Sequence, residues 1–468
     1  MPANLTPSPS STISTSETPL EQEESEEVEE AEEGGEAWES IYECVLRQRR
    51  RACRGDPDLQ YVSDSLPESY HKSVHSDSST LVYSHESFST FQDRVVELCK
   101  NIWLVRPKDI IVERLKGGGF NRIIGITRQF DNEEAVQFRY VLRIPRSETS
   151  QVACDVAALL FVKYHTAIPV PTVIGFDTTN QNSILSTYMI QDRVPGANLY
   201  DTYLSLGHKD RCKVARELGD VYREILAVRS NTHGVLVPKP GDKNIESPIH
   251  VAPLPIRDFW EPVVPNDPLT VKPYSDSAPT QSTLEIFTSL FQARKAYRMG
   301  KYRGSDDRIF MDQFCVMASE LDADGWLSDV PISLVHLDLG PHNILVDVDT
   351  RSEDPIISSI LDWDSAVLFP MFLACEPPLW LWAWNEDEDE DERTANDIPP
   401  TLEARELKQI FEEAAGPDYM RFAYRPEYRL ARKLSSFALE GISSTDRILE
   451  AGKMLKEWRK LHQSYTRF

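Results

Sequence analysis

Short apolar runs, broken by glycine and polar turns, dominate the chain from Asp109 to about residue 195. Such a pattern favours β-strands over helices. The first three runs read as antiparallel strands, joined by a glycine loop and then by a polar turn at residues 131–134. The five predicted strands cover residues 110–115, 122–130, 137–144, 172–177 and 183–190.

One helix interrupts this series of strands. Apolar residues recur with largely helical spacing between residues 150 and 165, and prolines at positions 169 and 171 prevent the helix from continuing. Five strands and one helix therefore predict a small, strand-rich lobe.

The remainder of the chain, beyond Pro195, has a predominantly helical pattern. Between residues 210 and 227, apolar positions recur at intervals of three, four and seven, which gives one buried stripe. Residues 235–275 are rich in proline and are expected to be irregular. Further helices are expected at residues 284–299, 309–321, 402–415 and 448–462. The predicted fold class is α+β.

The N-terminal region is acidic and rich in serine. Eleven glutamates fall between Glu21 and Glu39, and few large apolar residues accompany them. A segment of this composition buries too little apolar surface to offset the entropy of ordering, so we predict disorder. A second acidic run, Glu386 to Glu392, is expected to be solvated and flexible. The predicted organisation is a mostly disordered tail over residues 1–90, a first lobe over 91–195 and a second over 196–468.

Charge and cysteine usage narrow the possible functions. The formal net charge is −25, which argues against a nucleic-acid partner. The seven cysteines contain no CxxC pair and have no regular spacing, which argues against a disulfide framework and a zinc site. No apolar stretch is long enough to span a bilayer, and the N-terminus resembles no secretory or mitochondrial signal. We therefore expect a cytoplasmic protein; oligomeric state is not predicted.

The strongest chemical signal is His336-x-Asp338-x₄-Asn343, a polar loop between two apolar runs. Flanking strands would hold Asp338 and Asn343 together, where the aspartate could accept a hydroxyl proton and the amide oxygen could bind Mg²⁺. Asp362 follows Asn343 by 19 residues and is the second expected metal ligand. It begins the sequence Asp-Trp-Asp, which comes directly after a short apolar run. Asp364 could support Asp362. His336 is expected to be structural, and His342 a loop residue without a chemical role.

A glycine run, Gly117, Gly118 and Gly119, lies between the first two predicted strands. Without Cβ atoms, these residues would let backbone N–H groups approach a phosphate. The run could equally be only a tight turn. Its position ahead of the other motifs favours nucleotide binding.

Taken together, these motifs resemble the aminoglycoside phosphotransferase and choline kinase-like family, a branch of the protein-kinase-like fold. The resemblance runs from about Leu115 to Phe369. It implies a bilobal molecule, with a small antiparallel-sheet lobe and a larger helical lobe, that binds ATP and Mg²⁺ in the cleft between them. Asp338 would be the catalytic base, Asn343 and Asp362 the magnesium ligands, and residues 189–194, including Gln191, the hinge beside adenine.

Two departures from the family pattern concern the phosphate site. The family usually has lysine on the third strand, paired with glutamate on the next helix; this chain has Arg143 and Asp155. Arg143 could clamp phosphate and pair with Asp155, or the pair could only stabilise the lobe, because a guanidinium is larger and differently aimed than an ammonium. The loop also reads Gly-Pro-His-Asn at residues 340–343, where many members have His-Pro-Gly-Asn.

The acceptor is predicted by exclusion. Protein kinases carry Asp-Phe-Gly and Ala-Pro-Glu motifs, which this chain lacks, so a hydroxyl of a small molecule is the expected acceptor. Trp380, Trp382 and Trp384 could receive a cationic amine, but are more simply core residues. The alternative function is a weakly active or silent nucleotide-binding scaffold, resembling a pseudokinase, because the usual lysine and glutamate are absent.

Overall fold

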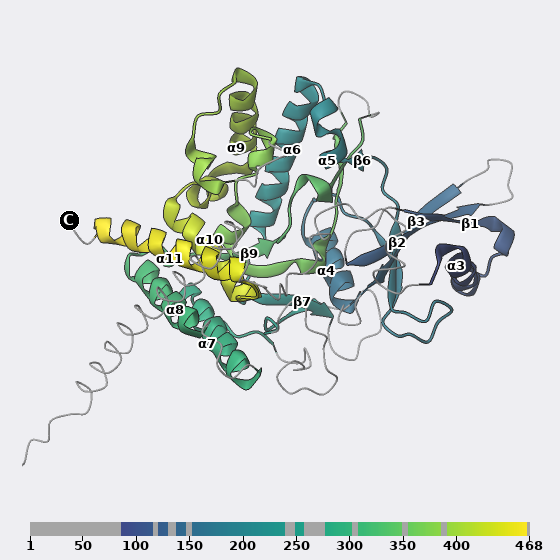
Figure 1. Ribbon diagram of the computed structural model, residues 1–468. Coiled ribbons are helices and arrows are strands. Elements are labelled where there is room, and N and C mark those ends of the chain that lie inside the picture. The colour runs from purple at the N-terminus through teal and green to yellow at the C-terminus, as the bar shows by residue number, and fades with distance from the viewer. Residues whose placement is uncertain are drawn as a thin grey trace, which may run out of the picture.

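The computed structural model has two lobes, with the sheet of the first lobe to the right in Figure 1 and the helices of the second to the left. The structure describes residues 86–115, 120–129, 137–146, 152–238, 249–256, 277–301, 308–348, 354–384 and 391–465. The predicted disordered tail, up to residue 85, and Gly117 to Gly119 lie outside the described residues.

A five-stranded antiparallel sheet forms the first lobe, in the order β1-β2-β3-β5-β4. The meander predicted from the sequence is confirmed: each residue of β1 pairs with β2, and β2 pairs along its whole length with β3. β5 is shorter than predicted, because the Asn182 side chain bonds to Ser186 O and to the amide of Ile184 and holds a turn there. The strands are β1 (Ile110–Arg114), β2 (Asn121–Gln129), β3 (Gln137–Pro145), β4 (Val173–Asp177) and β5 (Tyr188–Asp192).

Two helices flank this sheet. α3 (Phe88–Trp103) buries Phe91, Val95 and Leu98 in a cluster with the inward side chains of β2 and β3. α4 (Val152–His165), the predicted helix, instead buries its apolar face in the core of the second lobe. The first lobe is therefore anchored to the second through α4.

Two small sheets at the centre of the second lobe position the polar loops. β9 (Ile332–Val335) belongs to the sheet β8-β7-β12-β9, and β10 (Ile344–Val346) belongs to β11-β10-β6. The other strands are β6 (Ala197–Asn198), β7 (Gly234–Pro238), β8 (Ile249–Ala252), β11 (Ile357–Ile360) and β12 (Val367–Pro370). The expectation of irregular chain throughout residues 235–275 is therefore wrong for β7 and β8, which pair with each other.

Helices cover these sheets and complete the lobe (Figure 1). α10 was not predicted, because charged residues occupy buried positions in it: Arg432 is 4% exposed and Arg429 6%. The helices are α5 (Leu199–Thr202), α6 (His208–Ala227), α7 (Thr283–Lys301), α8 (Arg308–Ala323), α9 (Leu402–Phe422), α10 (Pro426–Glu440) and α11 (Thr445–Tyr465).

The contact between α6 and α9 depends on one glycine. A Cβ on Gly219 would lie 2.6 Å from the Cβ of Ala414 and 2.7 Å from the carbonyl oxygen of Phe411. The two helices can approach so closely only because this position has no side chain.

Charged side chains have more specific roles than the sequence suggested. Glu392, placed in a solvated acidic run by the sequence pattern, has a side chain only 13% exposed and pairs with the buried Arg432. Trp380 and Trp382 are buried in the core, as the simpler expectation held.

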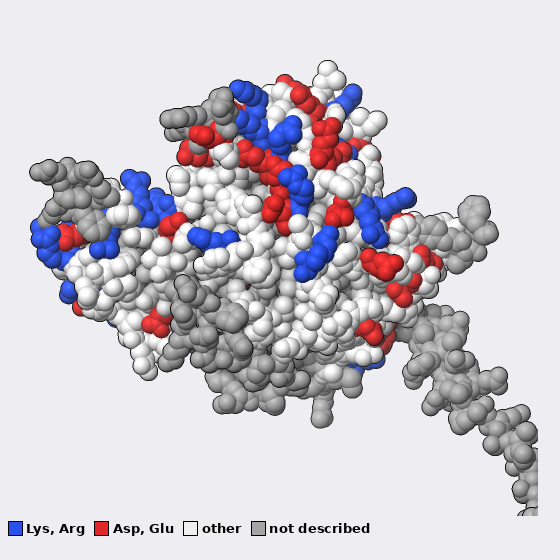
Figure 2. All heavy atoms as spheres, turned by 180° about the vertical axis from the view of Figure 1, so that it is seen from behind, with Lys and Arg blue, Asp and Glu red and all other residues white. Residues whose placement is uncertain are grey.

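On the face shown in Figure 2, acidic and basic side chains intermingle over the upper part of the molecule. Among the described helices, none combines the length and apolar character that a membrane crossing requires.

Candidate active site

The loop that carries Asp338 and Asn343 is fixed at both ends by strands. It leaves β9 at Val335 and enters β10 at Ile344, as the two flanking apolar runs predict. The amide of Leu361 donates to the carbonyl of Asn343 at 2.7 Å, which ties this loop to the segment that contains Asp362. The two halves of the predicted metal site are thus brought together.

His336 is the structural link between these segments. Its Nε2 lies 2.8 Å from the carbonyl oxygen of Leu361, so this nitrogen carries the proton and donates it. Its Nδ1 then accepts from the amide of Asp338 at 3.2 Å. Burial lowers the pKa of His336, which favours this neutral form. The arrangement agrees with a structural role, as expected.

The Asp338 carboxylate is half-exposed and bonded to its own loop. Its Oδ2 accepts from Asn343 Nδ2 at 3.0 Å and lies 3.2 Å from His342 Nε2. Partial burial acts to raise the pKa of Asp338, but the hydrogen bond and charge of His342 outweigh it and lower the pKa below its usual value. Asp338 is therefore ionised at neutral pH. Because the Asn343 amide nitrogen faces Asp338, its oxygen Oδ1 is the atom that could bind a metal.

His342, expected from the sequence to be a loop residue without a chemical role, contacts Asp338 directly in the structure. The ring folds back over Gly340, where a Cβ would lie 2.7 Å from its Cε1 atom. Glycine at position 340 thus makes room for the imidazole to reach Asp338. The exchanged order of glycine and histidine in Gly-Pro-His-Asn is the signal that could have revealed this contact.

Asp362 follows the end of β11 by two residues and has an unusual backbone conformation. Its φ and ψ are 63° and 50°, in the left-handed region that non-glycine residues seldom occupy. The following Trp363 is fully buried, and its ring lies edge-on to His336 at 4.6 Å. Packing of Trp363 holds the turn, and Asp362 keeps 39% of its side chain exposed beside Arg143. Backbone strain of this kind is typical of functional sites.

Arg143 connects the first lobe to this turn. From the middle of β3, its Nη2 donates to Asp362 Oδ1 at 3.0 Å and to Asp364 Oδ2. The sequence suggested that Arg143 could pair with Asp155. Within the described residues, the side chain of Arg143 instead bonds to Asp362 and Asp364. Asp155 acts on Arg143 only through its charge. The shorter Asp155 side chain extends less far from α4 than a glutamate would.

Three carboxylates therefore surround one guanidinium. Burial raises the pKa of Asp364, and the neighbouring Asp362 raises it further, while Arg143 acts in the opposite direction. Burial and the charge of Asp364 likewise hold the pKa of Asp155 well above its usual value. Asp364 Oδ1 is buried and has no hydrogen-bond partner among the described residues. A hard cation such as Mg²⁺ fits this donor set, because it would offset the surplus negative charge.

Two further polar residues of the first lobe bear on this site. Asn121, to which the sequence analysis gave no role, donates to Asp364 Oδ2 at 3.3 Å. Its place directly after the glycine run was the available signal. Gln191, on β5, is 6% exposed, and its Oε1 has no partner within the described part of the chain. This buried acceptor fits a donor such as the amino group of adenine.

Comparison with known proteins identifies the family. A family model described as the phosphotransferase enzyme family (APH) matches residues 126–396, more than half of the chain. Two similar proteins are subtelomeric hrmA-associated cluster proteins from two strains of Aspergillus fumigatus, each 24% identical over 311 residues. These matches cover 57% of this chain, which spans 60% of the length of each relative.

Solved structures with a similar arrangement are aminoglycoside phosphotransferases. APH(4)-Ia, in a ternary complex with AMP-PNP and hygromycin B, is 16% identical with a TM-score of 0.42, and the match covers 78% of this chain and 97% of that one. The GDP complex of aminoglycoside 2'-phosphotransferase-IIIa is 14% identical with a TM-score of 0.42, covering 80% and 99%. A putative aminoglycoside phosphotransferase from Ralstonia eutropha is 14% identical with a TM-score of 0.41, covering 80% and 98%.

Proposed function

Because the chain belongs to the APH phosphotransferase enzyme family, we propose that it transfers the γ-phosphoryl group of ATP to a hydroxyl of a small molecule, with Mg²⁺ as cofactor. The observation that carries this proposal is the ionised, half-exposed Asp338 carboxylate beside the Asn343 amide and the Asp362 turn. The proposal is supported by two links between these residues: the amide of Leu361 bonds to the carbonyl of Asn343, and Arg143 of the other lobe bonds to Asp362.

Asp338 is the catalytic base in this proposal. Its carboxylate accepts the proton of the acceptor hydroxyl as the hydroxyl oxygen bonds to phosphorus, the bond from phosphorus to ADP breaks, and ADP leaves. The hydrogen bonds from Asn343 and His342 fix the direction of the carboxylate, so the hydroxyl is oriented as well as deprotonated.

Asn343 and Asp362 hold the metal, and Asp364 supports it. Mg²⁺, when bound, supplies positive charge to the phosphate oxygens. Arg143 can serve the same oxygens from β3, and Gly117 to Gly119 can contribute backbone amides. Gln191 and the neighbouring hinge residues bind adenine. Asp155, on α4, attracts the guanidinium of Arg143 when its carboxyl group is ionised.

The acceptor is a small molecule rather than a protein. The chain has no Ala-Pro-Glu segment and its metal turn reads Asp-Trp-Asp. The reaction requires ATP and Mg²⁺, both of which the cytoplasm supplies. We therefore propose a cytoplasmic location for the protein.

Turnover of ATP against a panel of hydroxylated metabolites tests the proposal. We expect at least one acceptor to stimulate release of ADP and to gain a phosphoryl group detectable by mass spectrometry. Asp338→Ala should lower kcat by a factor of about 10² or more, the range for loss of a general base. Turnover that survives this substitution would exclude Asp338 as the base.

A second function is favoured by one specific contact. Arg143 bonds directly to Asp362, the proposed metal ligand, and could keep it from the metal, which would leave a nucleotide-binding scaffold without activity. Thermal melting distinguishes the cases. Mg·ATP at a hundred times its Kd should stabilise a binding-competent chain by about 2.7 kcal/mol, and only an enzyme should then release ADP. No stabilisation at saturating Mg·ATP would contradict both functions.

A further inference from the structure

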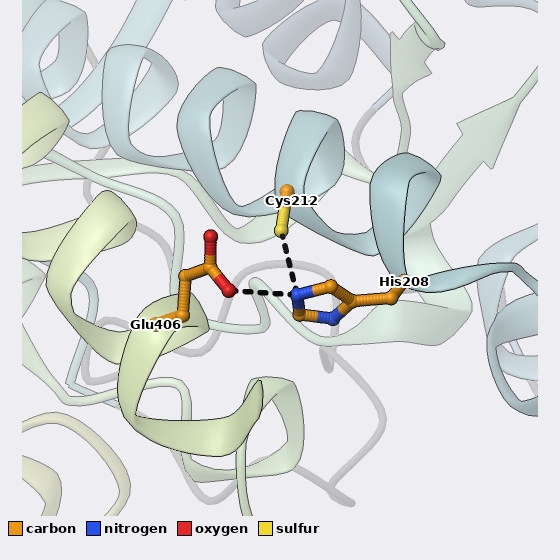
Figure 3. A group of neighbouring side chains, drawn as sticks. All are labelled: His208, Cys212 and Glu406. Atoms are coloured by element: carbon orange, nitrogen blue, oxygen red, sulfur yellow. Dashed lines mark hydrogen bonds and ion pairs between the residues drawn. The ribbon is translucent and has the colours of Figure 1, made fainter. Parts of the chain in front are cut away.

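Three side chains of metal-binding type meet where α6 and α9 begin, away from the cleft (Figure 3). His208 and Cys212 are one helical turn apart on α6, and Glu406 reaches them from α9. A spacing of four residues places two side chains on the same face of a helix. Two helices that pack side by side thus present three different ligand atoms to one point.

The distances between these atoms are close to those within a coordination shell. His208 Nε2 lies 2.9 Å from Glu406 Oε2 and 3.5 Å from Cys212 Sγ. The three ligand atoms, one from each residue, all lie within 4.8 Å of one another. Tetrahedral zinc with ordinary bond lengths separates its nitrogen from an oxygen by about 3.3 Å and from a sulfur by about 3.6 Å. Small side-chain adjustments would bring the three atoms into this geometry.

Hydrogen bonding explains the cluster less completely than a cation does. A neutral imidazole has at Nε2 either a proton to donate or a lone pair to accept, so it cannot donate to Glu406 and accept from the Cys212 thiol together. A cation at the centre would satisfy all three atoms. In Figure 3, the Glu406 carboxylate and the Cys212 sulfur both lie against the same ring nitrogen of His208.

We propose that His208, Cys212 and Glu406 form a binding site for a divalent transition-metal ion, with Zn²⁺ as the natural occupant. A thiolate, a carboxylate and a neutral imidazole carry two negative charges in total, which a divalent cation neutralises. Mixed nitrogen, sulfur and oxygen donors suit zinc, whereas Mg²⁺ requires oxygen ligands. Glu403, one turn before Glu406, adds negative charge near the thiol.

The site is open to solvent and bridges two helices. The Glu406 side chain is 59% exposed and that of His208 32%, so an ion can enter and water can complete the fourth position. His208 Nδ1 has no hydrogen-bond partner among the described residues, and no outer group therefore fixes the ring. These two features describe an exchangeable site that joins α6 to α9, rather than one on which folding depends.

Zinc binding to the full-length chain tests the proposal after treatment with a chelator. Competition against a chromogenic chelator should detect Zn²⁺ at this site, and thermal melting should show a rise in Tm on saturation. Cys212→Ser and Glu406→Gln should each weaken zinc binding by at least about tenfold. Co²⁺ in place of zinc should give the near-ultraviolet thiolate-to-metal absorption of a sulfur ligand, and Cys212→Ser should abolish it.

Cys315→Ser is the matched control, because Cys315 is a half-buried free thiol on α8 that belongs to no such cluster among the described residues. It should leave both the affinity and the Co²⁺ spectrum unchanged. Affinity that is the same in wild type, Cys212→Ser and Glu406→Gln would overturn the proposal. Loss of the Co²⁺ thiolate band in Cys315→Ser, with the band kept in Cys212→Ser, would assign the sulfur ligand elsewhere and overturn it as well.

Discussion

Arg143 is the residue on which the electrostatics of the cleft depend most. It replaces an expected lysine, and its planar guanidinium can contact two carboxylates at once, whereas an ammonium is a compact point charge. In the structure it holds Asp362 and Asp364 together across the boundary between the lobes. Binding of a metal at Asp362 would therefore have to share this carboxylate with Arg143 or release it.

His342 offers a direct test of the geometry around Asp338. Its hydrogen bond to Asp338 raises the pKa of His342 above 6.5, so the protonated ring pairs with the carboxylate. Stability from this pair is fully present below the unfolded pKa and is lost as pH rises through the folded one. Because both side chains are more than half exposed, solvent screening keeps the contribution small.

We therefore expect the ring of His342 to titrate above 6.5 in an NMR pH titration. Asp338→Asn should return its pKa towards the ordinary value, since the hydrogen bond to a carboxylate is the main cause of the shift. An unchanged His342 titration in Asp338→Asn would contradict the contact.

Asp155 should destabilise the folded protein as pH rises. Burial and the charge of Asp364 hold its folded pKa well above the usual range, so above the unfolded pKa the folded state retains a proton that the unfolded state has lost. Stability attributable to this group therefore falls between its unfolded and folded pKa values. Asp155→Asn should abolish this loss, and its Tm relative to wild type should increase as the pH rises above about 4, the unfolded pKa of an aspartate.

Thermal melting across this pH range checks the expectation. Asp220→Asn is the control, because it removes an exposed carboxylate that pairs with Arg223 on the surface of α6 and should alter Tm little at any pH. A Tm of Asp155→Asn that falls relative to wild type as pH rises would show instead that an ionised Asp155 stabilises Arg143.

At the scale of elements, Gly219 determines how closely α6 and α9 pack. Helix propensity alone predicts that alanine would stabilise α6 by up to about 1 kcal/mol. The structure predicts the opposite, because the new Cβ would lie 2.6 Å from Ala414 Cβ and 2.7 Å from backbone. We expect Gly219→Ala to lower the free energy of unfolding by about 1–3 kcal/mol.

Denaturant unfolding of Gly219→Ala measures this change. Gly175→Ala on β4 is the matched control, since no atom lies within 4 Å of its added Cβ, and it should be neutral or slightly stabilising. A Gly219→Ala protein as stable as the wild type would mean that the helices can separate at no appreciable cost.

Elements with clear periodicity were predictable from the sequence, and those with a mixed pattern were not. β1, β2 and β3 have apolar runs bounded by turn residues, and the structure confirms them within a few positions. α10 contains buried arginines, which bond to Glu457, Glu392 and the carbonyl of Phe372, at 28, 40 and 60 residues along the chain. Local patterns cannot reveal partners of this kind, because only the tertiary fold supplies them.

At the scale of the whole molecule, the sequence predicted the types of residue in the cleft but not their pairing. The His-x-Asp loop and Asp-Trp-Asp turn have recognisable spacings, and strands place them together. By contrast, Arg143 and Asp362 are 219 residues apart, and no local signal shows that they bond to each other rather than Arg143 to Asp155. The contact of Asn121 with Asp364 spans 243 residues and was missed for the same reason.

These long-range contacts also make the two lobes depend on each other. Asn121 and Arg143 of the first lobe meet Asp362 and Asp364 of the second, so the carboxylates that would hold the metal also hold the cleft together. A bound metal ion would neutralise part of the carboxylate charge that Arg143 offsets in this structure. We therefore expect the affinity for nucleotide to depend on the metal, and the affinity for the metal to depend on Asp362.

The most direct test of this account is calorimetric titration of ATP into the full-length chain, with Mg²⁺ and with EDTA. We predict binding with Mg²⁺, much weaker binding with EDTA, and at least about tenfold weaker binding of Mg·ATP to Asp362→Asn, while Asp220→Asn binds as the wild type does. Equal affinity for ATP with Mg²⁺ and with EDTA, unaffected by Asp362→Asn, would contradict the assignment of this cleft as a magnesium-nucleotide site.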